Sequence, residues 1–463
     1  MSDNEAFNDV LERSRVGIPQ LYAVGLILLA LMIDGMDIQL LALVAPVIIE
    51  EWNATRTAFG PALSAAVVGM AIGSVLGGWL GDRFGRRRVL LISVAFFGIL
   101  TLLVSQAHDI AQLMTLRLLS GVGFGAALPN GLALASEWMP KAQRTRALSV
   151  LSIGVPIGGM LGAPLALALI PTFGWRGAFA ASGIFTIIVA FVMLKGVPES
   201  PGYLFGRKRF DIAARTITRT LGVTFTAPGV EEAHQPRTGH SAFRGLLSPG
   251  NMRMNLGVWL ASFCIAGFTY GVAAWGPVVY SANGLTLQQA INASFWHNAA
   301  AVVAALSTSF VLNRFGSKWP MVLALIIASA TMLGIGALLT TGLTKNAAEA
   351  CLFVLLLMTA AGYMAGFTTT AVYTLLSISY AQEYRTTAIG TGIMVGRVGA
   401  ILMITLGGAL LDIRPDGLGL FATLAALLLL AAVGALILDR HVAPRNTANR
   451  HQVGAGTLGA VER

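Results

Sequence analysis

Long runs of apolar residues alternate with short polar gaps along almost the whole chain. Each run is close to the ~20 residues that a helix needs to cross the hydrocarbon core of a bilayer. A spanning segment must satisfy its backbone hydrogen bonds internally, so helices are expected throughout. The pattern predicts twelve membrane-spanning helices, at about residues 21–49, 58–80, 89–106, 111–136, 147–170, 177–197, 255–281, 288–312, 320–341, 350–380, 386–411 and 417–438.

The polar gaps set the domain organisation and the topology. The longest gap separates two sets of six runs, so we expect an N-terminal half (1–197), a cytoplasmic central loop (198–253), a C-terminal half (254–438) and a cytoplasmic tail (439–463). The first run is too long and too charged for a signal-peptide core and should stay in the mature protein. With both termini in the cytoplasm, the basic residues left outside are Arg56, Arg176, Lys345 and Arg414. This distribution follows the positive-inside rule.

Composition excludes several classes of protein. The chain is 56% hydrophobic and 11% charged, whereas a soluble domain carries about 25% charge. The formal net charge is +10, but the basic residues lie in short gaps between apolar runs and not on one contiguous face. Nucleic-acid binding is therefore not expected. The two cysteines, Cys264 and Cys351, both fall inside apolar runs, so neither a disulfide framework nor a metal site is indicated.

A charged gap repeats within the chain. Residues 81–88 read Gly-Asp-Arg-Phe-Gly-Arg-Arg-Arg, and a degraded copy, Asn-Arg-Phe-Gly-Ser-Lys, occupies 313–318 in the same kind of gap, 231 residues later. A second trace matches Arg144-Thr145-Arg146-Ala147 to Arg385-Thr386-Thr387-Ala388. The chain is therefore a duplicated helical membrane protein.

The first of these loops resembles the signature loop between the second and third helices of the major facilitator superfamily. The resemblance implies an all-α integral membrane fold of twelve helices in two pseudo-symmetric six-helix bundles. We expect a salt-bridge lattice around this loop that includes the residues after the fourth helix. The expected gating residues are Gly81, Asp82, Arg83, Gly85, Arg86, Glu137, Arg144, Arg314 and Arg385.

Four ionisable residues lie deep inside the predicted spans: Asp34 and Asp37 in the first, Arg117 in the fourth and Arg397 in the eleventh. Each costs at least ~2.5 kcal/mol to insert, so such residues usually face a cavity and mark a substrate or ion path. Asp34 and Asp37 share a helical face, and one of two neighbouring carboxylates should hold a proton. Asp37 and Arg117 can alternatively neutralise each other as a structural pair.

The intramembrane motifs narrow the resemblance. The runs Asp34-Gly35-Met36-Asp37 with Ala45-Pro46, Arg117 to Gly123 with Pro129-Asn130, and Tyr384-Arg385 with Gly396 to Ala400 resemble the aromatic acid:proton symporter family. By this resemblance the two aspartates carry protons, and the arginines at 117, 385 and 397 are functional positions. The chain departs from the family at Asn313-Arg314, where Asp-Arg is usual, which weakens a charge-based role for the second loop.

Further residues are candidates for contact with a substrate. Asn130 belongs to the fourth-helix motif, and Tyr270 and Tyr363 lie in the seventh and tenth spans, which line the cavity in this superfamily. Their rings can stack on an aromatic substrate. His297, in the eighth span, is either a substrate or proton contact or a hydrogen-bonded packing residue.

We therefore expect a proton-coupled importer of a benzoate-like or hydroxybenzoate-like acid, working by alternating access in a bacterial-type cytoplasmic membrane. Its partners are the small aromatic acid, protons and the lipid bilayer, with no cofactor and a monomeric state. The alternatives are another major facilitator carrier (an aliphatic dicarboxylate symporter or an efflux antiporter) and a membrane receptor for aromatic acids. An enzyme is not expected, because no loop carries a recognisable catalytic motif. The identity of the acid and the proton stoichiometry stay open.

Overall fold

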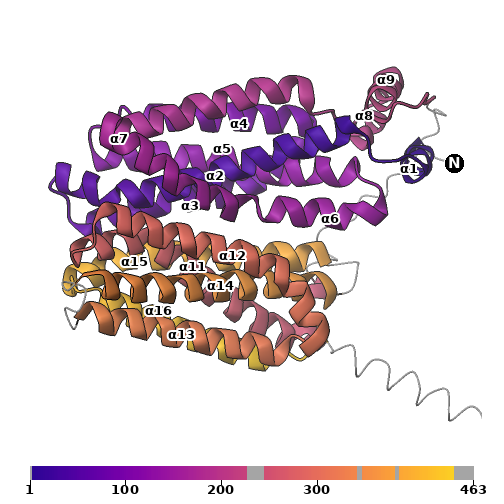
Figure 1. The fold of residues 1–463 in the computed structure, drawn as a ribbon. Helices are drawn as coiled ribbons and strands as arrows, with labels where there is room; N and C mark the ends of the chain where they lie inside the picture. Colours follow the sequence, from indigo (N-terminus) through magenta and orange to yellow (C-terminus); the bar gives the residue numbers. More distant parts are fainter. Residues whose placement is uncertain (1–2, 227–243, 341–346, 381–384, 443–463) are drawn as a thin grey trace, which may run out of the picture. The chain divides into compact units, whose positions relative to one another are not determined.

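The computed structural model describes residues 3–226, 244–340, 347–380 and 385–442, and regular structure in these segments is entirely helical (Figure 1). This agrees with the all-α class expected from the hydrophobic pattern. The long helices are α2 (Ile18–Glu51), α3 (Arg56–Phe84), α4 (Arg86–Val104), α5 (Ile110–Glu137), α7 (Gly154–Gly196), α11 (Pro249–Ala282), α12 (Leu287–Phe315), α13 (Lys318–Thr340), α14 (Ala347–Ile378), α15 (Arg385–Ile413) and α16 (Leu418–Ile437).

Helix α7 accounts for two of the twelve expected spans. It has 43 residues, about twice the length that a bilayer requires. Gly174 interrupts it with φ 65° and ψ −177°, a backbone conformation that essentially only glycine adopts. The kink divides α7 into two helices, so the eleven long apolar helices found in the described residues comprise twelve spans. The fifth span was expected to begin at residue 147. It begins instead at Gly154, because residues 141–152 form a separate helix, α6 (Lys141–Ser152).

The chain separates into two units. Unit 1 comprises Met1–Ala54 and Pro61–Pro236, and unit 2 comprises Thr55–Gly60 and Arg237–Arg463. In unit 1, α7 packs along α2 and α4, and α4 packs along α5. In unit 2, α11 packs along α15 and α16, α12 along α14, and α13 along α14 and α16.

Helix crossings in unit 1 bring backbones into direct contact. A Cβ atom on Gly35 of α2 would lie 1.9 Å from the carbonyl oxygen of Val155, so only glycine fits at this crossing with α7. Small residues permit such approaches where lipid removes the hydrophobic drive for helix association. The crossing fixes the rotation of α2 about its axis, and with it the direction of Asp34 and Asp37.

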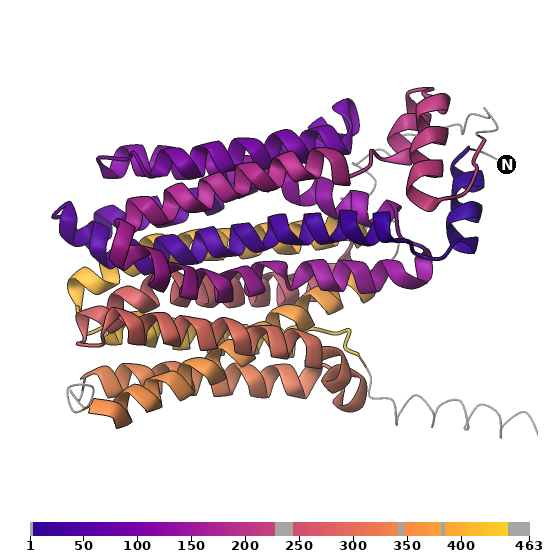
Figure 2. The ribbon, with the colours of Figure 1, turned by 45° about the horizontal axis from the view of Figure 1, so that its top comes forward.

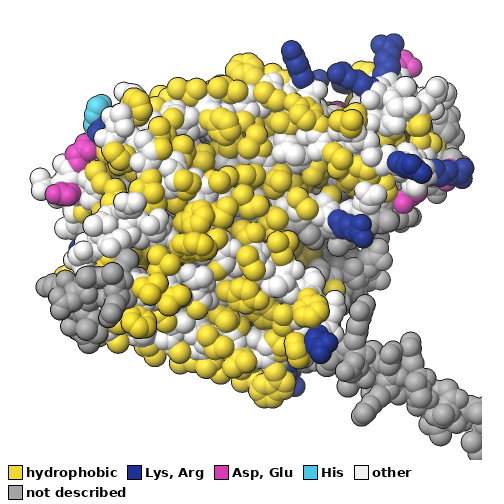
Figure 3. Space-filling view, in the orientation of Figure 1, with side chains coloured by type: hydrophobic (Ala, Val, Ile, Leu, Met, Phe, Trp, Pro, Cys, Tyr) yellow, Lys and Arg dark blue, Asp and Glu magenta, His cyan; other side chains and the backbone are white. Residues whose placement is uncertain are grey.

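Three short helices lie at one end of unit 1: α1 (Asp3–Arg13), α8 (Pro201–Gly206) and α9 (Phe210–Leu221). Figures 1 and 2 show them beside each other, beyond the ends of the long helices. We call this group the platform. In Figure 3 hydrophobic side chains cover the flanks of the long helices, and basic side chains gather where the platform lies. The sequence stretch expected to be a loop therefore contains α8 and α9.

Candidate functional site

The centre of unit 1 holds a buried ion pair between two helices. Arg117 of α5 donates from Nη1 to Oδ2 of Asp37 on α2, and the side chains are 1% and 2% exposed. Among the described residues, Oδ1 of Asp37 and Nε of Arg117 have no hydrogen-bond partner. The pairing that the sequence left open is thus present, but each side chain keeps one polar atom unsatisfied. Because these two atoms are unsatisfied, the carboxylate can accept a proton and the guanidinium can donate to a further polar partner.

Asp34 adds a second carboxylate at the same place. It is 3% exposed and lies three residues before Asp37 on α2, hence on the same side of the helix. The formal charges of Asp34, Asp37 and Arg117 sum to −1. Because an uncompensated charge in a low dielectric is costly, one bound proton would make this trio neutral.

Unit 2 carries the other intramembrane cation. Arg397 lies on α15 and is half-buried, unlike Arg117. Tyr373, on the neighbouring helix α14, is 47% exposed. A half-buried guanidinium and an exposed aromatic ring on two helices in contact match the two parts of an aromatic carboxylate, because arginine forms paired hydrogen bonds to a carboxylate and rings stack on rings.

The aromatic and histidine candidates of unit 2 differ in their surroundings. Tyr270 and Tyr363 are half-buried, and the Tyr363 hydroxyl lies 2.8 Å from Oγ of Ser307. His297 is 5% exposed, and its Nδ1 lies 3.3 Å from the carbonyl oxygen of Met358. The α12 backbone at His297 also touches Gly362 of α14, where a Cβ would lie 2.1 Å from the His297 carbonyl oxygen. These contacts favour the packing interpretation of His297.

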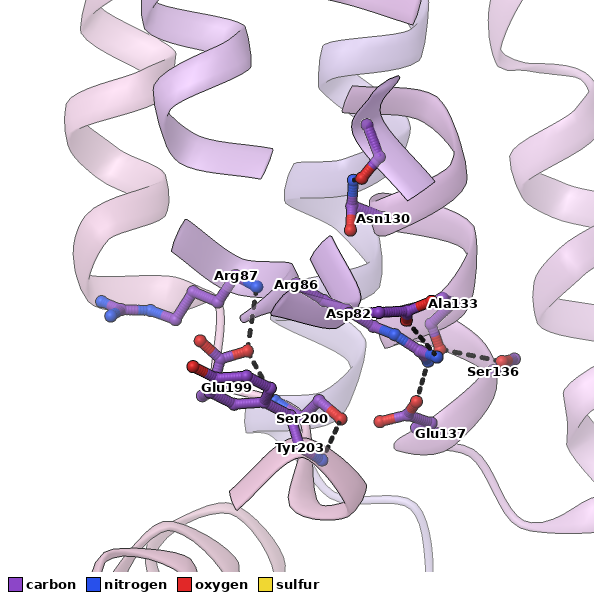
Figure 4. A network of polar contacts seen from close by, with 11 residues as sticks. Asp82, Arg86, Arg87, Asn130, Ala133, Ser136, Glu137, Glu199, Ser200 and Tyr203 are labelled. Atoms are coloured by element: carbon purple, nitrogen blue, oxygen red, sulfur yellow. Dashed lines mark hydrogen bonds and ion pairs between the residues drawn. The ribbon is translucent and has the colours of Figure 1, made fainter. Parts of the chain in front are cut away.

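Asn130 lies far from the buried pair. It is 13 residues beyond Arg117 on α5, which is about 20 Å along the helix. Its Nδ2 donates to the carbonyl oxygens of Gly77 and Ala126, each at 2.8 Å. A Cβ on Gly81 would lie 1.9 Å from Asn130 Oδ1. Asn130 therefore holds the end of α3 against α5 just before the charged loop (Figure 4).

The charged loop of unit 1 is held by a network of ion pairs and hydrogen bonds (Figure 4). Arg86 pairs with Glu137 at the end of α5 and, at 3.5 Å, with Asp82. Glu137, predicted from sequence, is thus placed against this loop. Gly85 between the two helices has φ 102°, a left-handed conformation that favours glycine. Arg83 is exposed, and its guanidinium lies 5.5 Å from the ring centres of Trp79 and Phe84.

Glu199, which was not among the residues predicted from sequence, completes this network. Its Oε1 accepts from the backbone N–H of Arg87 at 2.9 Å and from that of Ser200 at 3.0 Å. The Arg87 side chain donates from Nε to the carbonyl oxygen of Val197 at 2.7 Å. The sequence feature that could have identified Glu199 is the run Glu199-Ser200-Pro201 directly after an apolar span. A Ser-Pro pair can begin a helix, and an acid at this position can contact the basic loop.

The remaining gating candidates are Arg144, Arg314 and Arg385. Arg144 is half-buried on α6. Arg314 is exposed, with its guanidinium 5.7 Å from the ring centre of Phe315. Arg385 is the first residue of α15, and its side chain lies outside the described residues. A search of the described part of the chain finds no cluster of His, Cys, Asp and Glu that could hold a metal ion.

Comparison with known families identifies the class. The Major Facilitator Superfamily matches residues 27–348, and the chain belongs to this family. The partially occluded inward-open xylose transporter XylE from E. coli aligns with a TM-score of 0.73 at 17% identity, over 92% of this chain and 99% of that one. A D-xylose-proton symporter aligns with a TM-score of 0.71 at 18% identity, over 91% and 97%. Both likenesses support the fold.

The curated relatives include transporters of aromatic acids. A gallate transporter of Pseudomonas putida is 30% identical, over 90% of this chain and 91% of its own. A 3-(3-hydroxy-phenyl)propionate transporter of Escherichia coli is 29% identical, over 90% and 93%. The 4-hydroxybenzoate transporter PcaK of Pseudomonas aeruginosa is 28% identical, over 88% of each chain. The resemblance inferred from the intramembrane motifs is confirmed: the protein is similar to aromatic acid transporters of the superfamily.

Proposed function

We propose that this protein takes up an aromatic carboxylate together with protons across the cytoplasmic membrane, by alternating access, with both termini in the cytoplasm. The observation that carries the proposal is the buried trio of Asp34, Asp37 and Arg117 in unit 1, two acids and one base inside a membrane-spanning bundle. Transporters of gallate and 4-hydroxybenzoate among the relatives support hydroxylated benzoates as the substrate class.

The chemistry of each candidate residue suggests a separate role in transport. Protonation of Asp37 removes the negative charge that holds the Arg117 guanidinium, and loss of that proton restores the ion pair. Arg397, half-buried on α15, is assigned to the carboxylate of the substrate. Asn130, Gly81, Arg86 and Glu137 are assigned to the loop that controls opening, because their contacts lie there.

Proton coupling is tested in proteoliposomes with an imposed pH gradient and a radiolabelled hydroxybenzoate. We expect Asp34→Asn and Asp37→Asn each to abolish gradient-driven accumulation, because the substitution is nearly isosteric and removes only the titratable charge. Circular dichroism and detergent gel filtration check that both variants fold. Full accumulation by both variants would remove the proton assignment, and binding without flux in the wild type would favour a receptor.

The carboxylate assignment is tested by direct binding of an aromatic acid and its uncharged amide. Wild type should prefer the acid strongly. Hydrogen bonds to a charged partner contribute ~1.5 to 3 kcal/mol each, so Arg397→Ala should weaken acid binding by about tenfold or more. Arg397→Lys should be nearly as impaired, because an ammonium cannot reproduce the guanidinium fork. If Arg397→Ala still separates acid from amide, Arg117 becomes the leading candidate.

A further inference from the structure

The platform at the end of unit 1 is a folded element with its own core. Ala213 and Ile217 of α9 are fully buried, together with Leu11 of α1 and Leu204 of α8. The ring of Phe7 meets Trp138, the residue after α5, edge to face at 5.7 Å. Because these side chains pack on one another, α9 has a fixed inner face and a fixed outer face.

The outer face of α9 combines an apolar side chain with two arginines. Ile212 is 49% exposed, and Arg215 and Arg219 are also exposed. They lie at positions i, i+3 and i+7, hence along one stripe of the helix. Within the described segments neither guanidinium makes an ion pair. An exposed isoleucine flanked by unpaired arginines offers both an apolar and a cationic contact, the two that interfacial helices make with a membrane surface.

The charge of this segment is strongly one-sided. From Pro201 to Leu221 the basic residues are Arg207, Lys208, Arg209, Arg215 and Arg219, and the single acid is Asp211. The net charge is therefore +4 over 21 residues. Figure 3 shows basic side chains gathered at this end of unit 1. Such a segment next to a spanning helix is complementary to phosphate-bearing headgroups.

The bilayer lies within reach of the platform. Phe191 and Leu194, near the end of α7, are 66% and 47% exposed, as expected for side chains that face lipid. Only residues 197–200 separate α7 from α8, so the connection spans at most about 14 Å. The platform thus begins close to where a lipid-facing helix leaves the membrane.

We propose that the outer face of α9, formed by Ile212, Arg215 and Arg219, binds anionic phospholipid headgroups and so anchors the platform to the membrane surface. The proposal rests on the membrane orientation stated above. It gives the leaflet a connection to the charged loop, because Arg207 donates to the carbonyl oxygen of Arg83 and Glu199, just before α8, holds Arg87. Anionic lipid should then stabilise the network of polar contacts in Figure 4.

The test is hydrogen exchange of the full-length protein in nanodiscs of phosphatidylcholine alone or with one third phosphatidylglycerol. Peptides covering residues 207–221 should exchange several-fold more slowly with the anionic lipid. Each basic residue near an anionic surface contributes a factor of about five to binding. Arg215→Gln with Arg219→Gln should therefore weaken lipid association by about tenfold or more and remove the protection seen at one third phosphatidylglycerol.

A charge-matched control separates the α9 face from charge in general. Arg13→Gln with Arg15→Gln removes the same charge from the same end of unit 1 and should retain protection of α9. Inorganic phosphate added to phosphatidylcholine nanodiscs should not protect it. Equal exchange in the two lipids, equal loss in both double variants, or protection by free phosphate would each overturn the proposal. None of these measurements uses the transported acid, so a failure here is separate from a failure of the transport assignment.

Discussion

The two charged loops of the duplicated chain both turn at a glycine with positive φ, but different partners hold them in place. Gly85 and Gly316 both have positive φ, 102° and 77°. Arg83 and Arg314 each lie over the phenylalanine that follows, at 5.5 and 5.7 Å. The turn has therefore survived the divergence of the two halves.

The second loop is held by hydrogen bonds between the Ser317 hydroxyl and backbone and residues that follow α16. The first loop is held by the ion pairs of Arg86. Ser317, fully buried, donates its backbone N–H to the carbonyl oxygen of Val442 at 3.1 Å, and its Oγ accepts from the Val442 N–H at 2.9 Å. Oγ of Ser317 also lies 3.0 Å from Nδ1 of His441. Arg440 extends the contact by donating to the carbonyl oxygens of Ser379 and Gly250.

This difference indicates separate tasks. An ion-pair network of half-buried groups can be broken and remade as helices move, whereas hydroxyl and backbone bonds to the tail fasten the end of unit 2. We infer that the first loop controls the conformational equilibrium and that the second anchors the C-terminal segment. The asparagine at 313, expected to weaken a charge-based role, fits this division.

Within the comparison of the two loops, the largest expected effect comes from breaking the ion pair of the first loop. Glu137→Gln and Arg86→Gln should each slow transport about tenfold, because coupling energies of ~1 to 3 kcal/mol shift a two-state equilibrium by such factors. Substrate affinity should stay within a few-fold, since neither residue is among those assigned to the substrate. Initial uptake rates and equilibrium binding measure the two quantities.

The matched control for that experiment is Ser317→Ala in the second loop. It removes the hydroxyl from the equivalent turn and should leave the uptake rate nearly unchanged. Equal slowing by Ser317→Ala and Glu137→Gln would contradict the division of tasks between the loops.

An intermediate effect is expected from alanine at the two loop glycines. Forcing a Cβ into a positive-φ conformation costs ~1 to 3 kcal/mol, so Gly85→Ala and Gly316→Ala should both lower the thermal unfolding temperature. Gly85→Ala should lower it more, because its Cβ would also lie 2.6 Å from Oε2 of Glu199. Thermal denaturation in detergent measures both, and a smaller effect at Gly85 would contradict the role given to Glu199.

The smallest effect concerns the histidine of the tail. Burial and the nearby Lys318 ammonium hold the pKa of His441 below its ordinary value of 6.5, opposed by the Leu438 backbone hydrogen bond and Asp439. The folded protein therefore binds fewer protons there than the unfolded chain. The contact is fully stabilising above about pH 6.5 and weakens as the pH falls through the lowered pKa.

This assignment is checked by NMR titration of labelled histidine, with His441→Gln identifying the signal. Lys318→Gln should raise the pKa of His441 toward its ordinary value, because it removes a like charge. Lys195→Gln, in unit 1, serves as the charge-matched control and should not move it. A lower pKa of His441 in Lys318→Gln would show that the lysine acts in some other way.

Sequence alone determined the spans, the duplicated loop and the candidate charges, because these depend on local properties. A run of ~20 apolar residues is long enough to cross a bilayer whatever surrounds it. The repeated Arg-Phe-Gly motif at 83–85 and 314–316 marks the same turn in each half. A charge such as Asp34 inside an apolar run is costly in any fold, so its position in the chain is enough to indicate a functional role.

Only the tertiary structure decided which of these residues meet. The Asp37 and Arg117 pair depends on how α2 and α5 are rotated, and the glycine crossing of α2 with α7 helps to set that rotation. The contacts of Asn130 with the carbonyl oxygens of Gly77 and Ala126 likewise depend on how α3 and α5 pack, about 20 Å along α5 from Arg117. Glu199 and α9 acquired roles through packing between segments more than a hundred residues apart in the chain, and local sequence carries no record of such contacts.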